Sequence, residues 1–161
     1  MSTGDAVHLR PATRSDRSFV ERLSSEVFAR FGRYDRILPP LVKHPLVCTL
    51  IAETPEGAAG FAMFSWLSLS RKAEADLVAI AVSALSQRRG IGRVLLEGVE
   101  REVRREAGGV ACSVRLTVAE DNLPARRLFE SAGYRPIPGV RGCYEGGQLS
   151  LGMRKALPPF P

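Results

Sequence analysis

The sequence predicts a single α/β domain, spanning residues 1–161, in which helices flank a mixed and mostly antiparallel central sheet. From residue 74 onward the pattern predicts a strand, a glycine-containing loop, a long helix, a strand, a short helix and a strand, a βαβαβ succession typical of α/β proteins. Ahead of it, two apolar segments joined by a turn at residues 54–57 predict an antiparallel hairpin, which makes the sheet mixed. Neither a repeat nor a linker divides the chain.

The first half of the chain supplies the antiparallel part of this sheet. Residues 7–11 alternate and stop at proline, which suits a first strand, and Ser15 and Asp16 are N-cap candidates for a helix that Gly32 is expected to end. Residues 34–43 predict a short helical or irregular piece. Residues 46–53, 59–69 and 74–83 predict three strands, and the last has the nearly continuous apolar character of a central strand. Apolar residues recur at helical spacing in the first helix: Phe19, Val20, Leu23, Val27 and Phe28.

The second half holds the longest predicted helix, residues 91–107, with apolar side chains along one face and a glycine pair after its end. Residues 111–118 predict another strand. Asp121 and Asn122 are N-cap candidates for a helix that continues to about residue 132. A strand beginning at residue 133, a turn at 145–148 and a last strand over 149–154 complete the expected sheet.

Composition narrows the class of protein. The net charge of +6 comes mostly from arginines spread along the chain, which favours a solvated surface with a phosphate site over a nucleic-acid partner. Cys48, Cys112 and Cys143 fit neither a disulfide framework nor a C-x-x-C metal site, so reduced thiols and no metal are expected. Residues 1–5 lack the features of a signal peptide, and the longest nearly apolar run, at 57–69, is too short to span a bilayer. A cytoplasmic protein without a membrane partner is expected.

The segment from Ser86 to Arg93 is the strongest functional signal in the chain. It connects a buried strand to the start of a helix, and Gly90 and Gly92 allow the backbone to turn tightly and approach a ligand closely. The first N–H groups of a helix lack partners within it, and the macrodipole makes this end partly positive. The loop is therefore a seat for a phosphate or pyrophosphate, and Arg88, Arg89 and Arg93 add charge around it.

This loop differs from two common phosphate-binding motifs, because the chain has no G-x-x-x-x-G-K-[ST] and lacks the first glycine of G-x-G-x-x-G. Gln87-Arg88-Arg89-Gly90-Ile91-Gly92 instead resembles the [QR]-x-x-G-x-[GA] acetyl-CoA loop of the GNAT (Gcn-related N-acetyltransferase) superfamily. Residues 77–82, 87–92, 122–129 and 132–134 follow the family's order and spacing, so the resemblance covers most of residues 74–153. The branch that it resembles most acetylates protein N-termini, as ribosomal-protein alanine N-acetyltransferases do.

The resemblance implies a GNAT-like fold and an acetyl-CoA-dependent N-acetyltransferase. The strand before the loop would splay from its neighbour and offer backbone groups to the pantetheine amides, while the loop N–H groups would hold the pyrophosphate. Asn122 matches the family's asparagine near the CoA arm, and its other role is simply an N-cap. The implied cofactor-binding residues are Ile80, Ala81, Val82, Gln87, Arg88, Arg89, Gly90, Ile91, Gly92, Arg93, Asn122 and Phe129.

Attack of an amine on a thioester needs a base for the amine and a donor for the developing negative charge. Asp76 matches the glutamate that is the base in histone acetyltransferases of the family, and desolvation at the start of an apolar strand would raise its pKa. Asp76 could instead be an exposed carboxylate at a strand end without a catalytic role. Glu74, on the same face of the strand, is the alternative base. Phe129 occupies the position of the family's general-acid tyrosine, and Tyr144 is the candidate to supply the missing acid. Thr117 occupies the position of the base glutamate of the N-terminal branch.

Three functions stay open at this point. The first is a transferase acting on a primary amine, which could be a peptide N-terminus, a lysine or a small molecule. The second is a catalytically weak acyl-CoA-binding sensor, and the third, a nucleic-acid binder, has no motif in its support. The acceptor is expected to be selected by residues 31–43, 68–73 and 138–148, and the protein to be a monomer or homodimer.

Overall fold

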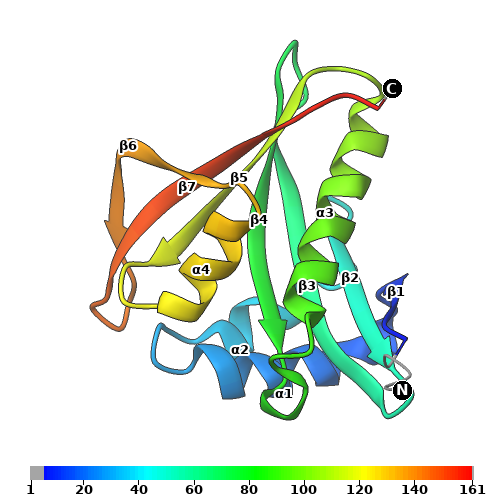
Figure 1. Ribbon diagram of the computed structural model, residues 1–161. Helices are drawn as coiled ribbons and strands as arrows, with labels where there is room; N and C mark the ends of the chain where they lie inside the picture. Colours follow the sequence, from blue (N-terminus) through cyan, green and yellow to red (C-terminus); the bar gives the residue numbers. More distant parts are fainter. Residues whose placement is uncertain (1–5, 161) are drawn as a thin grey trace.

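The computed structural model describes residues 6–160, which form one seven-stranded sheet with helices on both faces (Figure 1). The predicted fold class is confirmed. That the domain takes in the whole of 1–161 stays a prediction, and residues 1–5, on which the expectation of no signal peptide rests, lie outside the described residues. The strands are β1 (His8–Pro11), β2 (Val47–Thr54), β3 (Gly57–Ser68), β4 (Ala73–Val82), β5 (Cys112–Ala119), β6 (Arg135–Cys143) and β7 (Leu149–Leu157). The α-helices are α1 (Arg17–Phe28), α2 (Tyr34–Ile37), α3 (Ile91–Ala107) and α4 (Leu123–Ser131), and short 3-10 helices cover Arg14–Asp16, Pro39–Leu41 and Ala84–Ser86.

The strand order is β1-β2-β3-β4-β5-β7-β6, and β4 with β5 is the parallel pair among otherwise antiparallel neighbours. A simple βαβαβ succession would place β6 beside β5. Instead β7 pairs with the whole length of β5, and β6 lies at the edge of the sheet. Pro136 and Pro138 explain this arrangement, because proline cannot donate to a strand ladder and is confined to edges.

β4 and β5 pair over only the first half of β4. Their parallel register ends at Leu77 opposite Leu116. Beyond this point β4 continues along β3 and β5 continues along β7, so the two central strands diverge. The divergence opens the sheet at its centre, as the family resemblance implied.

A β-bulge at Val78 coincides with the divergence. Leu77 opposes Phe64 of β3 and Ala79 opposes Met63, which leaves Val78 as the extra residue of β4. The bulge exchanges the two faces of the strand, because Leu77 packs with the cluster that includes α3 and α4 whereas Ala79 packs with the cluster that includes α1 and α2.

Two hydrophobic layers hold the helices to the sheet. α3 and α4 pack on one face, where Leu95, Leu96 and Val99 of α3 are fully buried. On the other face, Val20 and Leu23 of α1 pack against β2, β3 and the second half of β4. In Figure 1, α1 and α2 cross the lower part of the sheet. Among the described residues, β5, β6 and β7 contribute nothing to this second cluster.

Most of the predicted elements agree with the structure within two residues, but α1 differs. It ends at Phe28 rather than Gly32, and Asp16 occupies the predicted N-cap position without a side-chain capping hydrogen bond. Asp16 lies just before α1, but its carboxylate instead binds the guanidinium of Arg10 at 2.7 and 2.8 Å and the N–H of Thr13 at 2.7 Å. β7 also runs three residues beyond the predicted end at residue 154.

Candidate active site

The loop between β4 and α3 has the backbone geometry of an anion seat. Gly90 is the N-cap of α3 with a φ of +77°, and Arg88 has a φ of +65°, so two residues of the loop are left-handed. The first backbone hydrogen bond of the helix joins Val94 N to Gly90 O at 3.1 Å. The N–H groups of residues 91–93 therefore face the open end of the helix, where an anion can bind them.

Gly92 and Gln87 shape the loop in other ways. A Cβ at Gly92 would lie 3.3 Å from Cδ2 of Leu128, so the glycine allows α4 to pack closely against α3. Gln87 folds back, and its Nε2 donates to Val82 O at 3.1 Å. The carbonyl of Val82, expected to be free for the cofactor, therefore already has a partner.

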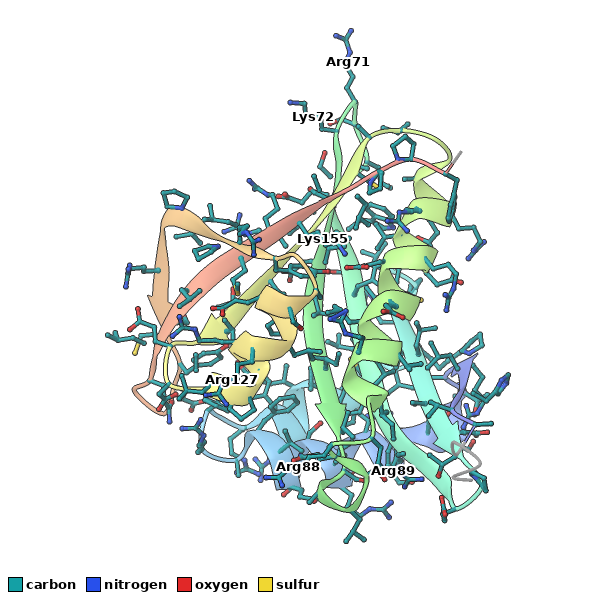
Figure 2. The ribbon with its side chains drawn as sticks, in the orientation of Figure 1. Arg71, Lys72, Arg88, Arg89, Arg127 and Lys155 are labelled. Atoms are coloured by element: carbon teal, nitrogen blue, oxygen red, sulfur yellow. The ribbon has the colours of Figure 1, made fainter. Side chains whose placement is uncertain are left out.

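Cationic side chains surround the seat. Figure 2 shows Arg88 and Arg89 below the start of α3 and Arg127 on the neighbouring α4. Arg93 points elsewhere, because its Nη2 donates to Ser131 O and Oγ at 3.2 and 3.1 Å. Arg127 was not predicted, since nothing in its local sequence indicates that α4 lies beside the loop.

A cavity of about 100 Å³ occupies the gap between β4 and β5. Of the residues predicted to bind the cofactor, Ile80, Asn122 and Phe129 line it. Ala81 lies on the opposite face of β4, buried in the cluster under α1. Ala81 lines neither this cavity nor the second one described below.

Asn122 and Phe129 each have a structural role in addition to their place in the cavity wall. Oδ1 of Asn122 accepts a hydrogen bond from Ala125 N at 3.4 Å, which makes Asn122 the N-cap of α4. Phe129 is only 4% exposed and packs edge-on against Tyr134 with ring centroids 5.9 Å apart. For both residues, the structural role is compatible with contact to a ligand.

A second, more polar cavity of about 370 Å³ adjoins the first. Asp76, Cys143 and Glu145 line the second cavity and not the first. The two cavities lie side by side and together are called the passage below; the residues that line both are Tyr34, Leu77, Val78, Thr117 and Tyr144.

The two carboxylates predicted as bases have opposite surroundings. Burial raises the pKa of Asp76, although the nearby charge of Arg115 opposes the shift, and no described residue hydrogen-bonds its carboxylate. Burial would also raise the pKa of Glu74, but hydrogen bonds from Arg154 Nε at 2.6 Å and Ser113 Oγ at 3.1 Å outweigh it and lower the pKa. Asp76 lines the second cavity, whereas Glu74 is committed to an ion pair outside it.

Tyr144 lies across the passage from β4. Its O–H donates to Thr117 O at 3.3 Å, and its ring contacts Phe31 with centroids 5.1 Å apart. Burial raises the pKa of Tyr144 to about 12, so the phenol stays protonated at neutral pH. Tyr34, whose pKa burial also raises, lines the same passage. The sequence contained no motif for Tyr34 beyond its place in the predicted acceptor segment 31–43.

Two of the three predicted acceptor segments meet at this passage. Gly146 N donates to Phe31 O at 3.1 Å, and Gln148 Nε2 donates to Arg30 O at 2.8 Å. A Cβ at Gly146 would overlap Arg30 O, so this contact requires glycine. The third segment, residues 68–73, lines neither cavity, and its Arg71 and Lys72 lie at the opposite tip of the molecule from Arg88 (Figure 2).

The cysteines Cys48, Cys112 and Cys143 are free thiols. Within residues 6–160, no group of three His, Cys, Asp or Glu side chains is placed to hold a metal ion. Over the same residues, no helix combines the length and apolar character needed to cross a membrane.

Comparison with known proteins gives independent evidence on the family of this chain. Residues 13–134 match the model of the acetyltransferase (GNAT) family. NAA60 of Arabidopsis thaliana with a bisubstrate analogue superposes with a TM-score of 0.79 at 18% identity, covering 94% of this chain and 98% of that one. Ard1 of Thermoplasma volcanium gives 0.79 at 21% identity, covering 95% and 99%. The ribosomal-protein-S18-alanine N-acetyltransferase of Escherichia coli gives 0.69 at 22% identity, covering 97% of each chain. No curated protein sequence matches the chain.

At these identities the likeness to solved structures speaks for the fold alone. The family match is stronger, because it spans both the N-terminal helices and the glycine loop through to Tyr134. The divergence of β4 from β5 after Leu77 is a feature that the resemblance implied, and the left-handed Gly90 gives the tight turn expected of the glycine loop. The chain belongs to the acetyltransferase (GNAT) family.

Proposed function

We propose that the protein is an N-acetyltransferase that moves an acetyl group directly from acetyl-CoA to a primary amine. The observation that carries this proposal is the passage through the sheet. β4 leads from the first cavity into the glycine loop, Asp76 lines the second cavity, and Tyr144 lines both. A donor and an acceptor entering from opposite sides would meet between β4 and β5.

The residues present fit acetyl-CoA. The N–H groups at the start of α3, together with Arg88 and Arg127, would hold its phosphates, and the space beside Gly90 is open, with no atom within 4 Å of a Cβ placed there. Beyond Leu77, the β4 edge that no longer pairs with β5 would offer backbone groups to the pantetheine arm. When bound, acetyl-CoA supplies an acyl group activated as a thioester.

Asp76 is the proposed base. A primary amine is protonated at neutral pH, so it must lose a proton before it can attack. The raised pKa of Asp76 makes its carboxylate a stronger proton acceptor, and it has no hydrogen bond within residues 6–160 that would have to break first. It would take the proton directly or through a water molecule. Glu74 is less suited, because Arg154 holds its carboxylate and its pKa is lowered.

Tyr144 is the proposed donor. Its protonated phenol can stabilise negative charge on the carbonyl oxygen or on the departing sulfur. The hydrogen bond to Thr117 O is long, at 3.3 Å, so the O–H can turn toward a ligand at small loss. Phe129, at the position of the family's tyrosine, has no O–H to donate.

The acceptor that we favour is a peptide N-terminus. The solved structures similar to this chain include a ribosomal-protein-S18-alanine N-acetyltransferase of Escherichia coli and a ribosomal-protein-alanine N-acetyltransferase of Brucella melitensis. Asp76 and Glu145 give the second cavity two carboxylates, which would attract an ammonium group. Lysine side chains and small amines carry the same primary ammonium group, so the experiment below includes them.

A catalytically weak acyl-CoA sensor is the second candidate, favoured by the absence of an O–H at Phe129. Release of free thiol from acetyl-CoA should be measured against N-terminal peptides, lysine peptides and small amines, alongside acetyl-CoA affinity by calorimetry. Turnover with at least one N-terminal peptide is the expected result. Tight binding without thiol release across the panel would favour the sensor, and absence of acetyl-CoA binding would refute both.

A further inference from the structure

Three arginines stand directly opposite one another on neighbouring strands. Arg115 of β5 is in register with Arg154 of β7, and Arg154 is in register with Arg135 of β6. The row continues to Asp76 of β4, which is in register with Arg115. Like charges directly opposite on one sheet face destabilise the pairing, so this row is unfavourable for folding by itself. A local conflict of this kind often marks a functional position.

Only part of this positive charge is compensated within the described residues. Arg154 is held by the carboxylate of Glu74, with Nε and Nη2 at 2.6 and 3.3 Å from its oxygens. Arg135 donates one hydrogen bond, to Tyr134 O at 3.3 Å. Arg115, although half-buried, makes neither a hydrogen bond nor a salt bridge with any residue from 6 to 160, Asp76 included. Arg115 is therefore a cation positioned for a partner from outside the chain.

The face that carries this row is open beside the acceptor cavity. α1 and α2 pack over the lower part of the sheet, and no described residue of β5, β6 or β7 belongs to their cluster (Figure 1). Thr117, two residues beyond Arg115 and so on the same face of β5, lines the second cavity. Asp76 lines it too, one strand away from Arg115, a spacing of about 4.8 Å.

We infer that Arg115 binds an anionic group of the acceptor, so that the preferred acceptors are amines carrying a carboxylate close to the amine. The inference rests on the proposed acetyl transfer and specifies its substrate. With the amine at Asp76, the carboxylate would lie about one or two strand spacings away, which an extended peptide covers in two or three residues. An acidic residue at the second or third position of a peptide meets this requirement, and so does a small amino acid of similar span.

Other charges near the cavity sharpen this preference. Glu145, which lines the second cavity with Asp76, would repel a carboxylate placed beside it and attract the ammonium group. Glu74 forms its ion pair with Arg154, and the nearby charge of Arg115 contributes less than Arg154 to the lowered pKa of Glu74. The arrangement therefore favours an acceptor with a fixed orientation, its amine toward Asp76 and Glu145 and its carboxylate toward Arg115.

The test compares matched acceptors with and without the carboxylate. One arm uses peptides that begin Ala-Asp and Ala-Asn, and another uses 4-aminobutyrate and its amide, which separates a peptide from a small-molecule source. For wild type, kcat/KM is expected to be about tenfold higher for the acidic member, the effect of one charge-assisted hydrogen bond, with the difference mainly in KM. Arg115→Gln should bring the ratio close to one. Arg101→Gln, the same change at an exposed position of α3, should leave the ratio as in wild type.

The possible outcomes separate this inference from the proposed function. Turnover of both members with equal kcat/KM overturns the role of Arg115 and leaves acetyl transfer standing, and so does an acidic preference that survives Arg115→Gln. If no acceptor releases thiol, acetyl transfer fails, and calorimetry with the same peptide pair decides the inference, with equal affinities overturning it. Arg115→Lys keeps the charge and should retain most of the preference, which guards against a folding defect in Arg115→Gln.

Discussion

The two sides of the proposed active site are built in different ways. On the donor side, the phosphate seat is one continuous segment, residues 86–93, whose conformation follows from a left-handed Gly90 and the start of α3. The acceptor side is assembled from separate elements, with Tyr34 from α2, Asp76 from β4, Thr117 from β5 and Tyr144 from the turn before β7. A phosphate seat can be local because backbone N–H groups are its ligands, whereas proton transfer needs particular side chains around a cavity. Substitutions on the two sides should therefore affect different steps.

The largest effect is expected from Asp76→Asn, which should lower kcat by about 10²–10⁴-fold because the general base is lost. Thiol release gives the rate, and calorimetry should show acetyl-CoA affinity close to that of wild type. In wild type, kcat/KM should rise as pH rises through the raised pKa of Asp76, since the ionised form is the base. Glu74→Gln, the equivalent change two residues away, should lose much less. Equal losses in both variants would exclude Asp76 as the base.

A smaller effect, about 10–100-fold in kcat, is expected from Tyr144→Phe, because the donor is removed while the ring contact with Phe31 is kept. The loss is below that of Asp76→Asn, since the CoA thiolate can leave with help from water. Tyr34→Phe is the matched control, because Tyr34 lines the same passage. If Tyr34→Phe slows thiol release more than Tyr144→Phe does, Tyr34 is the donor.

On the donor side, Gly90→Ala should weaken acetyl-CoA binding by about tenfold, because a left-handed residue with a Cβ costs about 1–2 kcal/mol and the side chain enters the phosphate seat. The KM for the acceptor should change little. Gly108, at the other end of α3, also has a positive φ of +61° and open space around it. Gly108→Ala should therefore lower the free energy of unfolding by about 1–2 kcal/mol, seen as a lower Tm, without changing acetyl-CoA affinity. Equal affinity losses would refute the seat.

The smallest effect concerns stability. The pKa of Asp76 is raised on folding, so ionisation opposes folding as pH rises through that pKa. Asp76→Asn should raise the Tm at neutral pH by about one or two degrees. This gain should vanish at acidic pH, where Asp76 is protonated in the folded and the unfolded protein. Glu74→Gln should lower the Tm at neutral pH. The lowered pKa of Glu74 stabilises the fold at any pH above the ordinary pKa of a glutamate, and this contribution is lost as the pH falls through the lowered pKa. Thermal melts between acidic and neutral pH would show the sign of each.

Local patterns predicted most of the elements because each depends on neighbours in the chain. The helix over Ile91–Ala107 was predicted to the residue from its apolar face and flanking glycines. The place of β7 between β5 and β6 was not predicted, although Pro136 and Pro138 carried the signal that β6 is an edge strand. The bulge at Val78 could not be anticipated, because it is a mismatch between β3 and β4 and neither strand shows it alone.

The amino-acid sequence alone decided the family and the glycine loop, and it supplied Asp76 and Tyr144 as candidates, because each follows from a motif or a position along the chain. How the acceptor side is assembled was decided only by tertiary structure. Gln148 contacts Arg30 across 118 residues of chain, and Tyr34 and Tyr144, from similarly distant parts of the chain, line one cavity. The open row of Arg115, Arg154 and Arg135 likewise exists only once three strands have found their register. Contacts of this kind depend on how whole elements pack, and no local pattern of residues encodes them.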